Sequence, residues 1–285
     1  MIISISGRIG AGKDTVGKII QILTRKPDRE NQNTSSWKTE EIIKMMPNPD
    51  WDDVFDWEIK KFAGKLKDIV CLLTGCTRQD LESQEFKDKE IGREWWSYRA
   101  GSWKNLLAPK PYLLTTPNFA TDKIVEELGH ERIKKPTYRL LLQELGTEAL
   151  RNVIHENVWV NSLFSDYKDE WDGMNTYNNT DKLPKWIITD TRFPNELKAV
   201  KDRGGLTINI VKRMDWKNPD GSYTKYHVGS MLDKRVNGER HASETALSNC
   251  DFDEVIYNEG DIEDLISEVR KILIKHKILK DELTS

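Results

Sequence analysis

The sequence predicts an α/β fold in which a parallel five-stranded sheet is flanked by helices. Short apolar runs that end in a turn alternate with segments whose apolar residues recur every three or four positions. This alternation is typical of a parallel sheet that is covered on both faces. The runs that we assign to strands lie at 1–6, 55–62, 185–190, 205–213 and 254–258.

Composition limits the classes of protein to which the chain can belong. Of its 285 residues, 37% are hydrophobic and 32% are charged, with a formal net charge of −3. This balance argues against a non-specific nucleic-acid binder. No apolar run has the length that crosses a bilayer, so we expect no membrane partner. The three cysteines have no metal-binding spacing and indicate reduced thiols in a cytoplasmic protein.

Organisation along the chain favours a single domain over 1–285 with polar additions. We expect inserts at 28–54 and 76–137, the second on the acceptor side, and a mobile lid at 214–240. The sequence leaves both a monomer and a homodimer open.

A glycine-rich segment follows the first predicted strand and carries the clearest chemical signal. Residues 7–13 read GRIGAGK and fit G-x-x-x-x-G-K, and a helical apolar stripe begins at Val16. Glycines let several backbone N–H groups converge on one anion, and the helix N-terminus adds its dipole. Lys13 then reaches the outer phosphates as a point charge. The residues expected to bind ATP are Gly7, Arg8, Gly10, Ala11, Gly12, Lys13, Asp14 and Thr15.

Asp14 stands where such a loop carries a serine or threonine that contacts magnesium. Thr15, one residue later and ~100° further around the helix, is the substitute hydroxyl and is expected to bond the α-phosphate. Nucleoside monophosphate kinases such as adenylate kinase also lack a hydroxyl directly after the lysine. The departure therefore favours a kinase of small molecules over a motor ATPase.

A second group of polar residues closes the predicted strand at 185–190, where the chain reads WIITDTRFPNE. Asp190 at the carboxyl end of that strand is suited to hold Mg²⁺, directly or through water. Arg192 is suited to bidentate capture of a phosphate, which suggests an acceptor that is itself phosphorylated. The alternative is a surface turn that Pro194 breaks.

The segment 138–154 is predicted to form a helix with two stripes. Its apolar stripe comprises Tyr138, Leu141, Leu142, Leu145, Ala149 and Val153. Its polar stripe comprises Arg139, Gln143, Thr147 and Arg151. Periodicity alone favours a solvated face for the polar stripe. Gly146 either weakens the helix or marks a close backbone approach to a ligand.

Several stretches together resemble the bacteriophage-type deoxynucleoside monophosphate kinases of the P-loop superfamily. They read GRIGAGKDT, KFAGKLKDI, LLQELGTEALR, VWVNSLF, TDTRFPNE, HASETAL and VIYNEGDIEDL. The resemblance implies a P-loop kinase fold and transfer of the γ-phosphoryl group of ATP, with Mg²⁺, to a deoxynucleoside monophosphate. It assigns the acceptor site to Lys65, Arg139, Gln143, Gly146, Thr147, Arg151, Trp159, Asp190, Arg192, Glu196, Ser243 and Glu244.

Phosphoryl transfer needs charge neutralisation and positioning, so Lys13, Arg192 and Asp190 are the candidate catalytic residues. A lid arginine, drawn from Arg213, Arg235 and Arg240, either closes over ATP or is exposed solubilising charge. Two other functions stay open. One is a P-loop kinase of another small molecule, such as dephospho-coenzyme A, and the other is a nucleotide-binding regulator without turnover.

Overall fold

The structure is a computed structural model of the chain. It describes residues 1–25, 38–46, 56–95, 97–99, 113–114, 133–168, 183–217, 223–227 and 246–280. The chain forms two compact units: the first combines 1–62 with 160–285, and the second spans 63–159.

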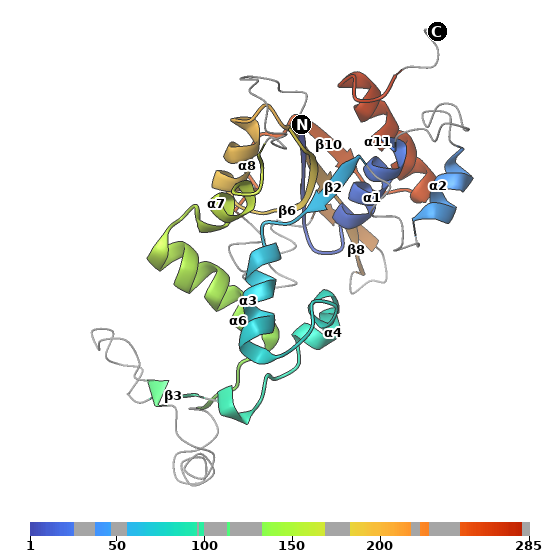
Figure 1. Ribbon diagram of the computed structural model, residues 1–285. Coiled ribbons are helices and arrows are strands. Elements are labelled where there is room, and N and C mark those ends of the chain that lie inside the picture. The colour runs from blue at the N-terminus through green and yellow to red at the C-terminus, as the bar shows by residue number, and fades with distance from the viewer. Residues whose placement is uncertain are drawn as a thin grey trace, which may run out of the picture. The chain divides into compact units, whose positions relative to one another are not determined.

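The first unit is built on a five-stranded sheet in the order β10-β7-β1-β6-β2, with every neighbouring pair parallel (Figure 1). Ile3 lies opposite Ile187 on one side and Leu206 on the other, so the centre of the sheet is apolar. The sheet confirms the predicted fold class. Its strands are β1 (Ile2–Gly7), β2 (Trp57–Lys60), β6 (Lys185–Thr191), β7 (Leu206–Val211) and β10 (Glu254–Tyr257).

Helices cover both faces of this sheet. α1 (Lys13–Leu23) and α11 (Ile262–Lys275) pack together on one face, and α8 (Pro194–Lys201) packs against β1 and β7 on the other (Figure 1). The side chains that the sequence predicted to face the core from α1 are all fully buried: Val16, Ile19, Ile20 and Leu23. Asp261 caps α11 by accepting hydrogen bonds from two backbone N–H groups of its first turn, as predicted.

Part of the expected insert at 28–54 belongs to the core of the first unit. α2 (Thr39–Met45) contacts α1 and α11, and its Ile42 is fully buried in their cluster. The remainder of that insert lies outside the described residues, apart from the segments flanking α2. Ile43, Met45 and Met46 are partly buried against the same cluster, and this apolar stretch is too short for its periodicity to predict a helix.

Gly17 allows α1 to lie close to β6. A Cβ atom at this position would stand 2.6 Å from the Thr189 methyl carbon and 3.6 Å from Ile187 Cγ2. Gly17→Val is therefore expected to cost about 1–3 kcal/mol of the free energy of unfolding, because the helix must move off the strand. Urea denaturation measures the loss. Gly64→Ala is the control, since nothing lies within 4 Å of its Cβ position, and equal losses in both variants would refute the packing argument.

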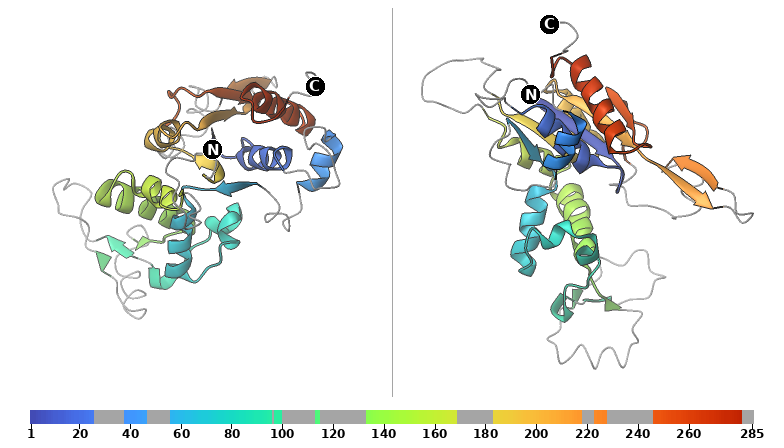
Figure 2. Two further views of the ribbon diagram at one scale, coloured as in Figure 1. Left: turned by 45° about the horizontal axis from the view of Figure 1, so that its top comes forward. Right: turned by 90° about the vertical axis from the view of Figure 1, so that its right-hand side faces the viewer.

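The second unit consists of short helices and a three-stranded antiparallel sheet in the order β4-β3-β5 (Figure 2). Leu66 and Val70 are the buried residues of its longest α-helix, α3. The elements of this unit are α3 (Gly64–Thr74), η3 (Asp80–Glu82), α4 (Gln84–Lys87), η4 (Arg93–Trp95), β3 (Ser97–Arg99), β4 (Leu113–Leu114), β5 (Ile133–Lys134), α6 (Tyr138–Gln143), η6 (Glu144–Ile154) and the start of α7 (Val158–Phe164).

The predicted helix at 138–154 exists, but its predicted apolar stripe is wrong in the second half. α6 passes directly into η6, which is π-helical, so each turn takes more residues than an α-helical turn. The phase of the buried face therefore shifts. Val153 is 72% exposed, whereas Gly146 and Arg151 are buried. π-Helical segments are rare and occur often at functional sites, so η6 is a candidate part of the functional site.

The segment expected to be a mobile loop at 214–240 contains a β-hairpin. β8 (Arg213–Lys217) pairs antiparallel with β9 (Tyr223–His227), and Figure 2 shows this ribbon extending beyond β7. Regular pairing over five residues in each strand shows that part of the expected lid is a β-hairpin, and its closure over the nucleotide stays a prediction. Arg235 and Arg240 lie outside the described residues.

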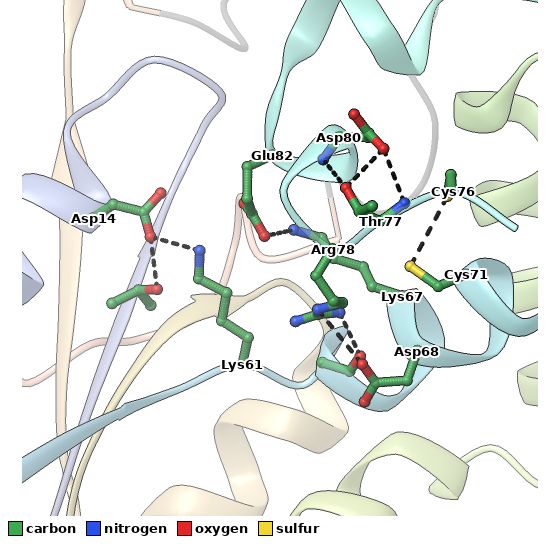
Figure 3. Close-up of polar contacts among 12 residues, drawn as sticks. Asp14, Lys61, Lys67, Asp68, Cys71, Cys76, Thr77, Arg78, Asp80 and Glu82 are labelled. Atoms are coloured by element: carbon green, nitrogen blue, oxygen red, sulfur yellow. Dashed lines mark hydrogen bonds and ion pairs between the residues drawn. The ribbon is translucent and has the colours of Figure 1, made fainter. Parts of the chain in front are cut away.

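All three cysteines are free thiols, and Cys76 Sγ lies 3.9 Å from Cys71 Sγ in the second unit (Figure 3). Among the described residues, no helix combines the length and the apolar character that crossing a bilayer requires.

Candidate phosphate-binding and acceptor site

The glycine-rich loop joins the end of β1 to the start of α1, as the motif requires. Gly12 occupies the N-cap position of α1 and no side chain caps the helix. The first N–H groups of α1 therefore lack the side-chain acceptor that Asp261 supplies to α11. Lys13 Nζ donates a hydrogen bond to Arg8 O at 2.8 Å, so the lysine bends back over the loop. An uncapped helix start beside a lysine is suited to bind phosphate.

Two glycines make the loop conformation possible. Gly12 has φ of +101°, in the left-handed region that favours glycine. Gly7 lies against β7, where a Cβ atom would stand 2.7 Å from Ile210 O, a backbone atom that cannot move aside. The loop is thus held by backbone geometry in the position that its sequence pattern predicts.

Asn258 braces the loop and was not assigned a role from the sequence. It follows β10, its Nδ2 donates a hydrogen bond to Ala11 O at 2.8 Å, and its backbone N–H is bonded to Val211 O. The same amide nitrogen would lie 2.8 Å from a Cβ atom on Gly12. Asn258 therefore fixes the loop from the neighbouring strand end, and its only sequence signal is the quoted stretch VIYNEGDIEDL.

Asn258→Ala is expected to loosen this brace. Losing one hydrogen bond is expected to reduce stability by about 1 kcal/mol and to raise the KM for ATP several-fold, because the loop must then be ordered by the nucleotide itself. ATP titrations and thermal unfolding measure the two effects, with Asn161→Ala on α7 as an exposed control. An unchanged KM for ATP would mean that Asn258 has no part in the site.

Asp190 and Glu196 organise the segment that follows β6. Asp190 is 7% exposed, and its Oδ1 accepts the Phe62 N–H at 2.7 Å, which ties the end of β6 to the end of β2. Glu196 is 2% exposed, and its Oε2 accepts the N–H groups of Arg192 and Phe193 at 2.8 and 3.1 Å. Glu196 therefore holds the backbone at the start of α8, whereas Asp190 holds the backbone of the segment that follows β2.

Arg192 is presented at the same sheet edge as the glycine-rich loop. Ser6 pairs with Thr191 in the register between β1 and β6, so Gly7 and Arg192 each lie one residue beyond that pair. The Arg192 side chain is partly exposed, and among the described residues its guanidinium has no hydrogen-bond or ion-pair partner. A partnerless guanidinium whose backbone is fixed by Glu196 is well prepared to bind an anion.

Asp14 is bound on two sides. Its Oδ1 accepts a hydrogen bond from Thr189 Oγ1 at 2.9 Å and lies 3.1 Å from Lys61 Nζ (Figure 3). Burial raises the pKa of Asp14, but the charge of Lys61 and the Thr189 hydroxyl outweigh it, so its pKa lies below the ordinary value. Asp14 is therefore an anion directly after the loop lysine. The sequence pattern did not predict Lys61 or Thr189 as partners of Asp14.

The second unit contains the remaining described candidates. Arg139 forms an ion pair with Asp88, with Nε and Oδ1 2.6 Å apart, and also bonds Gln84. Lys65, Gln143 and Thr147 are at least partly accessible to solvent. Arg139 thus has a structural partner, which weakens the case for a direct role in binding.

Gly146 and Trp159 contact each other within this unit. Trp159 Nε1 donates to Gly146 O at 2.8 Å, and a Cβ atom on Gly146 would lie 2.7 Å from Leu66 Cδ2. The glycine thus permits close packing of α3 on η6. Arg151 is 9% exposed and bonds Glu156 O, so it does not belong to a solvated face. Ser243 and Glu244 lie outside the described residues.

The profile of the deoxynucleotide monophosphate kinase family matches residues 1–269, which is nearly the whole chain.

The chain belongs to the deoxynucleotide monophosphate kinase family.

Curated proteins of that name agree with the family match. The deoxynucleotide monophosphate kinase of Enterobacteria phage T4 is 27% identical over 135 residues, which cover 47% of this chain and 44% of the relative. The protein of the same name from Escherichia phage RB69 gives the same identity and coverage. The aligned residues span less than half of the length of either relative.

Because the chain belongs to a kinase family, we expect its reaction to need Mg²⁺. Within the described residues, no three histidine, cysteine or acidic side chains come together as a metal site. Mg²⁺ usually keeps several waters and binds through one or two carboxylates together with substrate phosphates. Asp190, near the carboxyl end of β6, and Asp14, in the first turn of α1, fit that pattern as the residues that would hold it, directly or through water.

Proposed function

We propose that this chain transfers the γ-phosphoryl group of ATP to a deoxynucleoside 5′-monophosphate, giving the deoxynucleoside diphosphate and ADP. The observation that carries the proposal is the pairing of two anion-binding groups at one sheet edge. The glycine-rich loop with Lys13 follows β1, and Arg192, whose guanidinium has no partner among the residues that the structure describes, follows β6, the adjacent strand. Membership of the deoxynucleotide monophosphate kinase family supports the choice of acceptor.

In this proposal the loop binds the donor and Arg192 binds the acceptor phosphate. The acceptor phosphate is mostly dianionic at neutral pH, since its second pKa is about 6, and its oxygen attacks without a strong general base. A bond forms from that oxygen to the γ-phosphorus, and the bond to the β–γ bridging oxygen breaks with the electron pair leaving on ADP. Lys13 and Arg192 stabilise the charge spread over the transferred group.

Other residues serve this arrangement by positioning. Glu196 fixes the backbone of Arg192, and Asp190 fixes the end of β2. Mg²⁺, when bound, neutralises charge on the donor phosphates. We assign Thr15 to the α-phosphate. On the family resemblance alone, we assign acceptor binding also to Lys65, Gln143, Thr147, Arg151 and Trp159, with Ser243, Glu244 and a lid over 214–240 as further contributors. The cytoplasm of an infected cell is the expected place of action.

Coupled measurement of ADP release across an acceptor panel tests the proposal. The panel comprises the four deoxynucleoside monophosphates, the ribonucleotides and dephospho-coenzyme A. We expect ADP release with at least one deoxynucleotide and none with dephospho-coenzyme A. Release with dephospho-coenzyme A alone would favour another small-molecule kinase. ATP binding without release for any acceptor would favour a regulator.

A further inference from the structure

A lysine that the proposed reaction does not yet use lies beside the glycine-rich loop. Lys61 directly follows β2, and its Nζ lies 3.1 Å from Asp14 Oδ1 (Figure 3). Asp14 comes immediately after Lys13, and Thr189 holds the same carboxylate from β6. The contact therefore joins the ends of β2 and β6 and the start of α1, all within the first unit.

The contact between Lys61 and Asp14 involves the loop position whose side chain usually reaches the metal beside the phosphates. In phosphate loops of this pattern, the residue after the lysine is a serine or threonine that reaches the metal beside the phosphates. Here that residue is an aspartate, whose charge would repel a triphosphate. Lys61, whose ammonium lies 3.1 Å from the Asp14 carboxylate, compensates that charge at the residue next to Lys13.

The ion pair between Asp14 and Lys61 can also separate without burying an unpaired charge. The Asp14 side chain is 73% exposed and the Lys61 side chain 27% exposed, so neither charge would be stranded in the core if they separated. Thr189 Oγ1 would still donate to the Asp14 carboxylate at 2.9 Å. The four-carbon stem of lysine allows its ammonium group to move without a change in the backbone.

We propose that Lys61 is a second phosphate-binding lysine, which Asp14 holds beside the loop and releases to the phosphates of ATP when the nucleotide binds. This inference rests on the proposed function, because it takes ATP as the donor. In this proposal, Asp14 binds the Lys61 ammonium group until ATP is present, a role that the usual loop hydroxyl does not have. Thr189 is then the residue that keeps Asp14 in place during the exchange.

Calorimetric titration of the full chain with ATP in EDTA tests this role, since no metal then competes for Asp14. Lys61→Met is expected to weaken ATP binding about tenfold, the size of one hydrogen bond between charged groups. Asp14→Asn is expected to strengthen binding several-fold, because it releases Lys61. The control is Lys60→Met, the preceding lysine, which pairs with Glu58 and lies over the Trp186 ring. It is expected to leave ATP affinity unchanged.

The double variant separates release of the lysine from simple loss of repulsion. The gain from Asp14→Asn is expected to shrink to about twofold or less when Lys61 is already methionine. If the pair only pins β2 to α1, both single variants instead weaken binding together and lower the melting temperature equally, and that result would overturn the inference.

The outcomes also distinguish this inference from the proposed function. If the unmodified chain binds no ATP, the proposed function fails and the inference fails with it. If the unmodified chain binds ATP and Lys61→Met binds it equally well, the inference alone is overturned. Should Lys61→Met fail to fold, Lys61→Gln and the Asp14→Asn variant decide by the same directions of change.

Discussion

Lys13→Met is expected to lower kcat for phosphoryl transfer by ~10²–10³-fold, the usual effect of removing one preorganised group that stabilises developing charge. Lys13 is the cation of the glycine-rich loop, and its Nζ already lies over the loop, 2.8 Å from Arg8 O. Its loss removes charge stabilisation that no other residue of the loop supplies in the same form, because the remaining donors are backbone N–H groups and the Arg8 side chain. Steady-state ADP release with saturating acceptor measures the effect.

The matched control for this prediction is Lys18→Met, a lysine on the same helix one and a half turns further on. Its kcat is expected to stay within about twofold of the unmodified chain, since the residue lies beyond the first turn of α1. A kcat of the Lys13 variant within tenfold of the unmodified chain would mean that the loop does not bind the reacting phosphates.

Arg192→Met is expected to lower kcat/KM for the acceptor by about 10- to 100-fold, which corresponds to the loss of charged hydrogen bonds to a phosphate. The reason is geometric: the guanidinium has no partner among the described residues, while Glu196 fixes the backbone that presents it. Arg192→Lys is expected to recover only part of the activity, because an ammonium group cannot bind two phosphate oxygens in one plane.

The effect of Arg192→Met is expected to be specific to the acceptor. The KM for ATP is expected to stay within about threefold, since the loop and α1 are untouched. Arg203→Lys serves as the control, because Arg203 donates to Ala199 O and lies 4.0 Å from the centre of the Phe164 ring. That variant is expected to change stability rather than the acceptor KM. An Arg192 variant that altered only the KM for ATP would assign the arginine to the donor.

Local patterns in the sequence predicted the fold well where the signal was itself local. The apolar stripe of α1, the Asp261 cap and the glycine-rich loop each depend on residues within one turn or strand, and each prediction was confirmed. The parallel sheet followed from the alternation of elements. The π-helical segment was missed because the apolar pattern was interpreted with the α-helical period, which differs from the period of a π-helix.

The site was predictable only in part, for a related reason. Asp190 and Arg192 were proposed from the sequence because they stand at the end of a predicted buried strand, and the structure places them at the end of β6. The partners of Asp14 and of the loop were not found, because Thr189 is 175 residues from Asp14 and Asn258 is 247 residues from Ala11. Parallel sheets bring such residues to one edge, and no single stretch of sequence records which side chains then meet. The sequence assigned Glu196 to the ligand and did not reveal that its Oε2 atom also accepts backbone N–H groups of its own turn.

Inhibition by an analogue that links adenosine to a deoxynucleoside through five phosphates tests the central claim most directly. If the donor loop and Arg192 serve one reaction at one sheet edge, the analogue occupies both positions at once. It is then expected to bind at least tenfold more tightly than ATP and to compete with both ATP and the deoxynucleoside monophosphate. Competition with ATP alone, at an affinity no better than that of ATP, would contradict the account.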